Sequence, residues 1–252
     1  MKSIILPPQN VEYTERDAAS GSVEIIGCYP GYGSTLGNAI RRVLLSSLEG
    51  AAATSVNISG AQHEFSTIEH IREDVVQILL NLKRVRFEST SDEPVKVSLK
   101  AKGEKTVTAG DIDVSSDVRV ANPDHVIANL TDKKATLDME ITVERGLGYV
   151  PVEQQEREEK EIGVIALDAI FTPVRRVNFT VDNVRVGKRT DYEKVRLDIE
   201  TDGTISPRDA FDQSVAILVE QFSSLIAQEE TVQKKGEEKE EKPKKAKKTK
   251  KQ

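Results

Sequence analysis

Residues 31–47 read GYGSTLGNAIRRVLLSS and predict a helix that begins directly after a glycine-containing turn. Ser34 or Thr35 is a suitable N-cap and Gly50 a suitable stop, so we expect the helix from Thr35 to about Leu48. At 100° per residue, the apolar side chains fall on one broad side. They are Leu36, Ala39, Ile40, Val43, Leu44 and Leu48. This side of the helix predicts a core or a tight interface.

The other side of the same helix carries Asn38, Arg42 and Leu45, spaced i, i+4 and i+7. A leucine beside an arginine on an otherwise polar surface indicates a second contact. The alternative is that a loop of the same chain covers Leu45 and that Arg42 is a solvated charge.

Three glycines, Gly31, Gly33 and Gly37, come close to the Gly-x-Gly-x-x-Gly pattern of dinucleotide-binding turns. The third glycine is one residue late, and no strand ending in an acidic residue follows about 20 residues on. The pattern therefore predicts a turn and close packing of the helix rather than a nucleotide site.

Further segments alternate between apolar and polar residues, which predicts strands with one buried face. These segments are Val23 to Cys28, Val95 to Leu99, Leu137 to Val143, Val177 to Val181 and Val195 to Ile199. Gly187 to Asp191 predicts a hairpin loop between the last two strands. Helices and strands come in blocks without sustained βαβ alternation, so the expected fold class is α+β.

Two more helices are expected, one from about Ile68 to Lys83 and one beginning at Ser206. Ser206 caps the last helix, with Pro207 in the first turn and Asp209 at the capping-box position. Spacings of four and three make a straight apolar seam along it. The seam consists of Phe211, Val215, Leu218, Phe222 and Leu225. Such a seam fits either the core of the chain or a second copy of it.

The end of the chain differs in charge from the rest. Residues 231–252 hold ten lysines and four glutamates, a net +6; the whole chain has −6, which leaves −12 for residues 1–230. Val232 and Ala246 are the only apolar residues of this segment, so it cannot offset the entropy of ordering and we expect a disordered arm. Contact with nucleic-acid phosphates and a solubilising role both remain open.

The residue types point away from catalysis by the chain itself. One cysteine, Cys28, and three histidines are too few for a cysteine-based zinc site or an iron–sulfur cluster, and no nucleophile has a recognisable base partner. We therefore expect no catalytic residue, cofactor or metal. No apolar run approaches about 18 residues, which predicts a cytoplasmic protein without a membrane span.

Several segments, in order, resemble the N-terminal assembly region of the bacterial RNA polymerase α subunit family. The first is the opening stretch, residues 31–47. The others are HEFSTIEHIREDVVQILLNLK (63–83), ERGLGYVP (144–151), DAIFTPVRRVNFTV (168–181), VGKRTDYEKVRLDIETDGTISP (186–207) and the last helix.

That resemblance implies an α+β protomer with two domains. Residues 1–50 and 172–230 would form a dimerisation domain from both chain ends, residues 51–171 an inserted, mainly β domain, and residues 231–252 the tail. In the family, the homodimer collects the large β subunit and then β′, together with further polymerase subunits. The implied role is that of a non-catalytic assembly scaffold for DNA-templated transcription by DNA-directed RNA polymerase, a nucleotidyltransferase as a complex.

The resemblance also implies two sets of contact residues. The set for β and β′ is Asn38, Arg42, Leu45, Lys83, Val174, Arg175, Arg176, Lys188, Arg189 and Asp191. The set for the dimer interface is Leu36, Ile40, Val43, Phe211, Val215, Leu218, Phe222 and Leu225.

The sequence departs from the family after the last helix. There the family continues through a linker into a small helical domain that binds promoter DNA, whereas this chain has the Lys/Glu-rich arm. We expect DNA contact through the complex, with a weak, salt-sensitive contribution from the arm. The alternatives are a free-standing nucleic-acid-binding protein acting through the arm, which the −12 charge of residues 1–230 disfavours, and the archaeal-type counterpart of the subunit.

Overall fold

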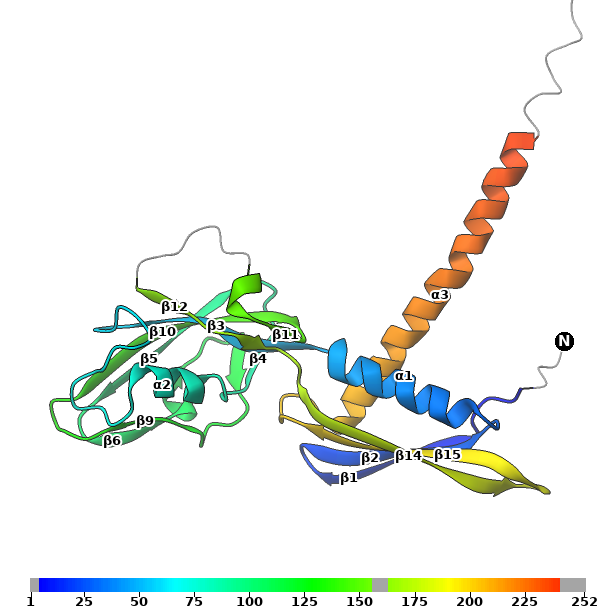
Figure 1. Cartoon of the computed structure of the whole chain (residues 1–252), viewed down its shortest axis with the longest axis horizontal. Helices are drawn as coiled ribbons and strands as arrows, with labels where there is room; N and C mark the ends of the chain where they lie inside the picture. Colours follow the sequence, from blue (N-terminus) through cyan, green and yellow to red (C-terminus); the bar gives the residue numbers. More distant parts are fainter. Residues whose placement is uncertain (1–4, 156–162, 241–252) are drawn as a thin grey trace, which may run out of the picture.

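The computed structural model describes residues 5–155 and 163–240. Strands from both ends of the chain form one antiparallel sheet with the order β1-β2-β15-β14. Its strands are β1 (Asn10–Asp17), β2 (Ser20–Cys28), β14 (Val174–Val186) and β15 (Arg189–Thr201). Figure 1 shows the blue N-terminal strands beside the yellow strands of the late sequence.

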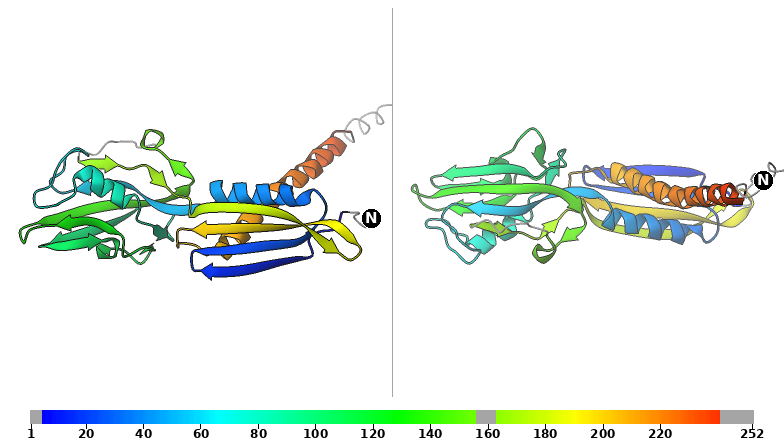
Figure 2. Two further views of the ribbon diagram at one scale, coloured as in Figure 1. Left: turned by 60° about the horizontal axis from the view of Figure 1, so that its bottom comes forward. Right: turned by 90° about the horizontal axis from the view of Figure 1, so that it is seen from above.

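Two helices, α1 (Tyr32–Ser46) and α3 (Pro207–Glu240), pack against each other and against this sheet. Alternating residues of the strands meet apolar residues of both helices in one core, to which Val195, Leu197 and Ile199 contribute from β15. The second part of α3 leaves the sheet and projects away from it (Figures 1 and 2). We call these six elements the terminal unit.

The middle of the chain forms a second, mainly β body, which we call the middle unit. Its larger sheet has the order β7-β5-β10-β3-β4-β8, with β12 paired to β3. The strands are β3 (Glu49–Ile58), β4 (Phe87–Ser89), β5 (Val95–Lys102), β7 (Ile112–Asp113), β8 (Val118–Val120), β10 (Thr136–Leu147) and β12 (Val164–Ala166). Two small pairs complete it, β6 (Lys105–Thr108) with β9 (Val126–Leu130) and β11 (Tyr149–Val150) with β13 (Ala169–Ile170).

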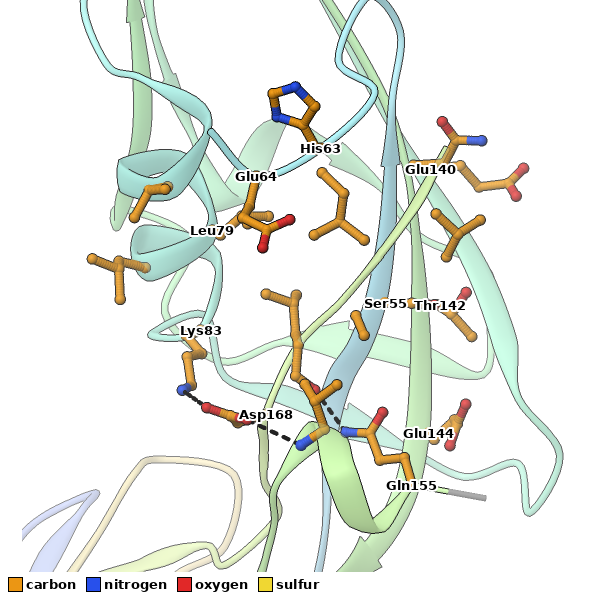
Figure 3. Close-up of a pocket in the computed structure, with 18 of the residues that line it drawn as sticks. Ser55, His63, Glu64, Leu79, Lys83, Glu140, Thr142, Glu144, Gln155 and Asp168 are labelled. Atoms are coloured by element: carbon orange, nitrogen blue, oxygen red, sulfur yellow. Dashed lines mark hydrogen bonds and ion pairs between the residues drawn. The ribbon is translucent and has the colours of Figure 1, made fainter. Parts of the chain in front are cut away.

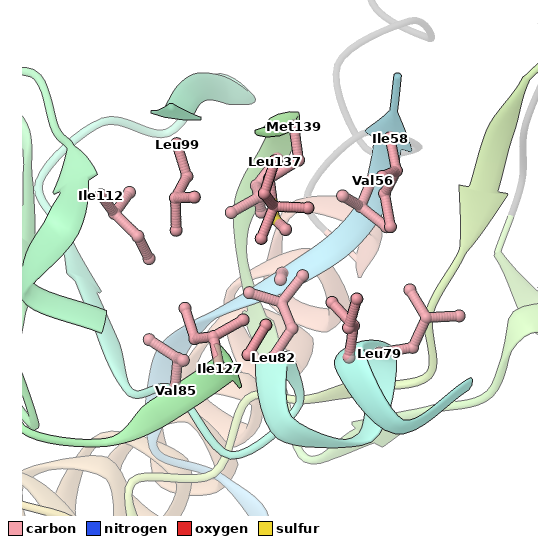
Figure 4. Close-up of a cluster of buried hydrophobic side chains, with 14 of the residues drawn as sticks. Val56, Ile58, Leu79, Leu82, Val85, Leu99, Ile112, Ile127, Leu137 and Met139 are labelled. Carbon is pink, nitrogen blue, oxygen red and sulfur yellow. The ribbon is translucent and has the colours of Figure 1, made fainter. Parts of the chain in front are cut away.

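The middle unit has its own core, closed by helix α2 (Val75–Leu82). Leu79 and Leu82 of α2 point toward Leu137 and Met139 of β10 and their neighbours (Figure 4). Fully burying an aliphatic side chain contributes roughly 1.5–3 kcal/mol, so this contact holds the short helix in place. The predicted α+β class is confirmed.

The first two helices differ from their predicted bounds. Helix α1 begins at Tyr32, before Ser34 and Thr35, and its N-cap is Gly31 in the left-handed region (φ 87°). Helix α2 begins only at Val75, because the Asp74 side chain accepts a 2.7 Å hydrogen bond from the Gln77 amide and caps the helix there. The expected start at Ile68 was therefore wrong.

The last helix begins as predicted and ends later than predicted. The Asp209 amide donates to Ser206 Oγ at 3.1 Å, so Ser206 is the N-cap. Helix α3 continues to Glu240, which corrects the expected disorder for residues 231–240. Lysine, glutamate and glutamine are good helix formers, so extending an established helix through them costs little. The rest of the predicted arm lies outside the described residues.

Candidate protein-interaction surfaces

Helix α1 lies along β14 with a regular register. A Cβ atom on Gly33 would come within 2.9 Å of Val181, and one on Gly37 within 2.6 Å of the Phe179 ring. Further on, Arg41 Nε donates a 3.0 Å hydrogen bond to the Val177 carbonyl. The two glycines therefore allow close packing of helix and strand, as the sequence predicts.

The first turn of α1 is held by a distant carboxylate. Glu193 of β15 accepts hydrogen bonds from the amides of Gly31 (2.9 Å) and Gly33 (2.7 Å). Free amides and the positive end of the helix dipole both favour a negative charge at this place. Glu193 lies about 160 residues further along the chain, so no local pattern predicts it as the partner of this turn.

The outer side of α1 is the first of the predicted contact surfaces. Asn38 and Arg42 are exposed, whereas Leu45 is half-buried and packs against the core of the terminal unit. The predicted exposure of Leu45 is corrected, because part of its side chain packs against that core. Arg42 is free to meet a partner, while its neighbour Arg41 is committed to Val177.

The segment at the start of β14 divides into core and surface. Val174 is 2% exposed and belongs to the core of the terminal unit, so its predicted role as a contact residue is corrected. Arg175 and Arg176 are exposed, and Arg176 pairs with Glu200 on the neighbouring strand. A register shift between Val174 and Arg176 breaks the alternation of the strand, so that both Val174 and Val177 are buried.

At the far end of the same strands, the β14–β15 hairpin carries Lys188, Arg189 and Asp191, all exposed. The turn itself is only Gly187 and Lys188, because β15 already begins at Arg189, so the expected loop from Gly187 to Asp191 was too long. Arg189 donates two hydrogen bonds to the Asp191 carboxylate, at 2.9 and 2.6 Å, and these bonds lower the pKa of Asp191. The Arg189 guanidinium also lies over the rings of Tyr192 (5.1 Å) and Tyr29 (5.7 Å). These contacts give the tip of the hairpin a fixed shape.

Lys83 lies in the middle unit, away from the surface along α1 and β14. Its Nζ is 2.7 Å from Asp168 Oδ2, and the other oxygen of Asp168 accepts a hydrogen bond from the Val152 amide at 3.1 Å. The hydrogen bond from Lys83 and that from Val152 lower the pKa of Asp168. Figure 3 shows this pair at the edge of an open pocket.

The pocket is lined by β3, β10, β12 and α2 together with the loop around His63 and Glu64. Several of its acidic side chains already have partners. Glu140 lies 2.8 Å from Lys96 Nζ, and Glu144 accepts a 2.9 Å hydrogen bond from Thr54. Such pairing is typical of a polar surface, whereas acid–base catalysis needs a group poised to exchange protons.

The residues predicted for a dimer interface fall into three groups, which are buried, half-buried and exposed. Ile40 and Phe211, each 5% exposed, lie in the core of the terminal unit, so their predicted role at an interface is corrected. Four of the predicted interface residues are half-buried: Leu36, Val43, Val215 and Leu218. The predicted apolar seam of α3 therefore begins too early in the helix. The first part of α3 packs its apolar face against α1 and the sheet, so that face is not available to a second copy.

The second part of α3 carries an exposed apolar strip. It consists of Val219 (59% exposed), Phe222 (61%), Leu225 (62%) and Ile226 (70%). Val219 and Ile226 are not part of the predicted seam, which steps from Leu218 to Phe222 and Leu225. They form a second row with Phe222, at helical spacings of three and four residues. Four large apolar side chains side by side on a projecting helix mark a protein-interaction surface.

Neither a candidate metal cluster nor a membrane-spanning helix is present in the described part of the chain. Within residues 5–155 and 163–240, no cluster of three histidine, cysteine or acidic side chains could hold a metal ion. The helices of the same residues include none whose length and apolar character would carry it across a membrane.

Comparison with known proteins agrees with this architecture. Residues 56–172 match the model of the RNA polymerase Rpb3/RpoA insert domain. The chain is 52% identical over 198 residues to a protein of Roseiflexus castenholzii and 50% identical over 198 residues to one of Herpetosiphon aurantiacus. Both relatives are named DNA-directed RNA polymerase subunit alpha. These matches cover 79% of this chain, but only 60% and 59% of the relatives' length.

The middle unit thus matches the Rpb3/RpoA insert domain, and in this chain it interrupts the sheet of the terminal unit. About half of the aligned residues are identical to those relatives, so the aligned part of this chain is similar to DNA-directed RNA polymerase α subunits.

Proposed function

We propose that the chain is a non-catalytic subunit of DNA-directed RNA polymerase that pairs with a second copy and scaffolds the assembly of the β and β′ subunits. The enzymatic activity, nucleotidyl transfer in DNA-templated transcription, belongs to the complex, and the proposed location is the cytoplasm. The single observation that carries this proposal is the exposed apolar strip on α3, in a chain whose relatives are polymerase α subunits.

The strip on α3 supports pairing of two copies. Burying a side chain of this size contributes roughly 1.5–3 kcal/mol, so its four residues contribute about 6–12 kcal/mol. Association costs about 4–15 kcal/mol in lost motion, so the strip needs further contacts to make a stable dimer. The half-buried residues predicted for the interface, Leu36, Val43, Val215 and Leu218, are the candidates for these contacts.

The exposed charges along α1 and the β14–β15 hairpin support contact with a large partner. Arg42 on α1, Arg175 on β14 and Lys188 in the turn lie on elements that pack together. Arginine at the centre of an interface often carries a large share of the binding energy. In a symmetric dimer this surface occurs twice, so one copy would meet β and the other β′.

A scaffold of this kind needs no catalytic group. Holding two large subunits on one dimer turns their mutual docking into an intramolecular step and raises their effective concentration. A free-standing nucleic-acid-binding protein is the weaker proposal, because residues 1–230 carry −12 and the relatives are polymerase subunits.

Reconstitution tests the proposal. The purified chain is mixed with purified β subunit, and then with β′, and the species are separated by size-exclusion chromatography with light scattering. We expect a complex with two copies of the chain and one β, which then takes up β′. Separate elution of the chain and β at micromolar concentration would contradict the scaffold function.

A further inference from the structure

The chain passes between the terminal and middle units twice, through two segments in direct contact. Gly50 enters β3 beside Phe171, so closely that a Cβ atom on Gly50 would lie 1.8 Å from the Phe171 carbonyl oxygen. The Phe171 amide donates to the Gly148 carbonyl at 2.8 Å. Two connections that lie close together can act as a hinge. They restrain rotation of one unit against the other least about the line that joins the two connections.

A third contact joins the units separately from both crossings. Arg86, just before β4 of the middle unit, places its Nε 3.8 Å from Oδ2 of Asp202, which lies in the turn between β15 and α3. The Arg86 side chain is 16% exposed and that of Asp202 only 5%. Burial lowers the pKa of Arg86, and the charge of Asp202 opposes that effect.

Each partner of this pair is fixed within its own unit. The Arg86 amide donates to Asn122 Oδ1 at 2.8 Å, and the Arg86 carbonyl accepts from the Ala121 amide at 2.8 Å. Asp202 Oδ1 accepts a 2.6 Å hydrogen bond from Thr204 Oγ1, and the Asp202 amide donates to the Pro173 carbonyl at 2.9 Å. A rotation of one unit against the other must therefore change the distance between the two charges.

Separating the charges would be costly. Arg86 Nη1 donates a long hydrogen bond of 3.5 Å to the Ile170 carbonyl, whereas Arg86 Nε is buried and has no hydrogen-bond partner among the described residues. The Asp202 carboxylate is therefore the counter-charge of this guanidinium. A buried guanidinium that loses its counter-charge keeps the desolvation cost without the attraction. The pair thus favours the one angle between the units at which the charges face each other.

We propose that Arg86 and Asp202 form an inter-unit lock that fixes the angle between the middle unit and the terminal unit. The lock sets how Lys83 and the pocket of the middle unit are oriented relative to the outer side of α1. This inference concerns the chain itself and does not rest on the proposed polymerase function.

Distance measurement between spin labels tests the lock in the full chain. Labels are placed through Lys133→Cys in the middle unit and Asn183→Cys on β14, both exposed positions, while the native Cys28 is buried. Labelled chain is diluted with an excess of unlabelled chain, so that distances within one copy dominate if copies pair. Asp202→Asn keeps an acceptor for Thr204 and removes only the charge, and Arg86→Gln removes the other charge. Arg84→Gln, an exposed arginine two residues away, is the matched control.

We expect one narrow distance distribution for the unsubstituted chain and for Arg84→Gln. Asp202→Asn and Arg86→Gln should broaden it about twofold or shift its centre, because the hinge is released. An unchanged distribution in Asp202→Asn would overturn the lock even if Arg86→Gln fails to fold. Equal broadening in Arg84→Gln would overturn it as well, since any loss of charge in this loop would then have the same effect.

Discussion

Lys83 Nζ lies 2.7 Å from Asp168 Oδ2 and thereby joins the end of α2 to the segment between β12 and β13. Asp168 also accepts the Val152 amide, so one carboxylate orders two segments far apart in the sequence. Lys83 therefore has a structural partner in addition to any contact that it makes with a large subunit.

Replacing Asp168 with asparagine should lower the free energy of unfolding at pH 7 by about 0.5–1 kcal/mol, as for other partly exposed ion pairs. The pKa of Asp168 is lower in the folded chain than its ordinary value of 3.8. The contribution is therefore present above pH 3.8 and disappears as the pH falls through the lower folded value. Urea unfolding at several pH values measures this difference, with Asp124→Asn at an exposed carboxyl as control. A difference that persists at the acid end would contradict the assignment.

Gly37 should not tolerate alanine. The new Cβ atom would meet the Phe179 ring at 2.6 Å, and overpacking of this kind costs about 1–3 kcal/mol. Alanine gains about 1 kcal/mol of helix propensity, so we expect a net loss of about 1 kcal/mol in chemical denaturation. In a Phe179→Leu background, which makes room, Gly37→Ala should instead be neutral or stabilising. A stabilising Gly37→Ala in the unsubstituted chain would show that the helix has space to move.

Phe222→Glu should convert a dimer into monomers. The substitution places a charge in the middle of the strip on α3, where pairing would bury it without a partner. Sedimentation velocity over a range of concentrations measures the change, and circular dichroism checks that the fold is intact. Gln221→Glu, an exposed neighbour outside the strip, should leave the dimer unchanged. An intact dimer in Phe222→Glu would refute the assignment of the strip.

Arg42→Ala should keep the dimer and weaken binding of the β subunit by about 2 kcal/mol, because an exposed arginine at the centre of an interface is a typical hot spot. Pull-down of β with tagged chain, followed by a titration, measures the loss. Arg16→Ala on β1 carries the same change of charge at another exposed place and should bind normally. Normal recovery of β by Arg42→Ala would contradict a contact through the outer side of α1.

The lysines at the chain end should contribute to DNA retention by the assembled enzyme. Residues 241–252 hold seven lysines and one glutamate, and charged side chains of this kind release counterions from phosphates. Removing these residues leaves α3 as described and should reduce the dependence of DNA binding on salt. Identical binding by both enzymes across a salt series would show that the segment makes no DNA contact.

Much of the terminal unit could be predicted from local patterns. The apolar face of α1, the β14–β15 hairpin and the cap at Ser206 depend on residues close in the sequence, and each is present in the structure. Strand β3 was missed because most of its residues, such as Ala53 and Val56, are buried whichever way they point, so the strand has no alternation to detect.

The remaining differences depend on contacts between distant parts of the chain. Glu193 caps α1 from another strand, and Arg86 meets Asp202 across the two units, so neither has a local signal. The inward orientation of Val174 follows from a register shift between Val174 and Arg176, which a period-two pattern cannot predict. Contact residues could be proposed from the resemblance, but only the fold separates those that face outward from those in the core.

The most direct test of the account is affinity purification of the tagged full chain from its native cell, with quantitative mass spectrometry of the proteins that remain bound. The account predicts β and β′ in equal amounts, each at one copy for every two copies of the chain. Recovery of the chain without either large subunit, under conditions in which polymerase stays assembled, would contradict its role as an assembly scaffold.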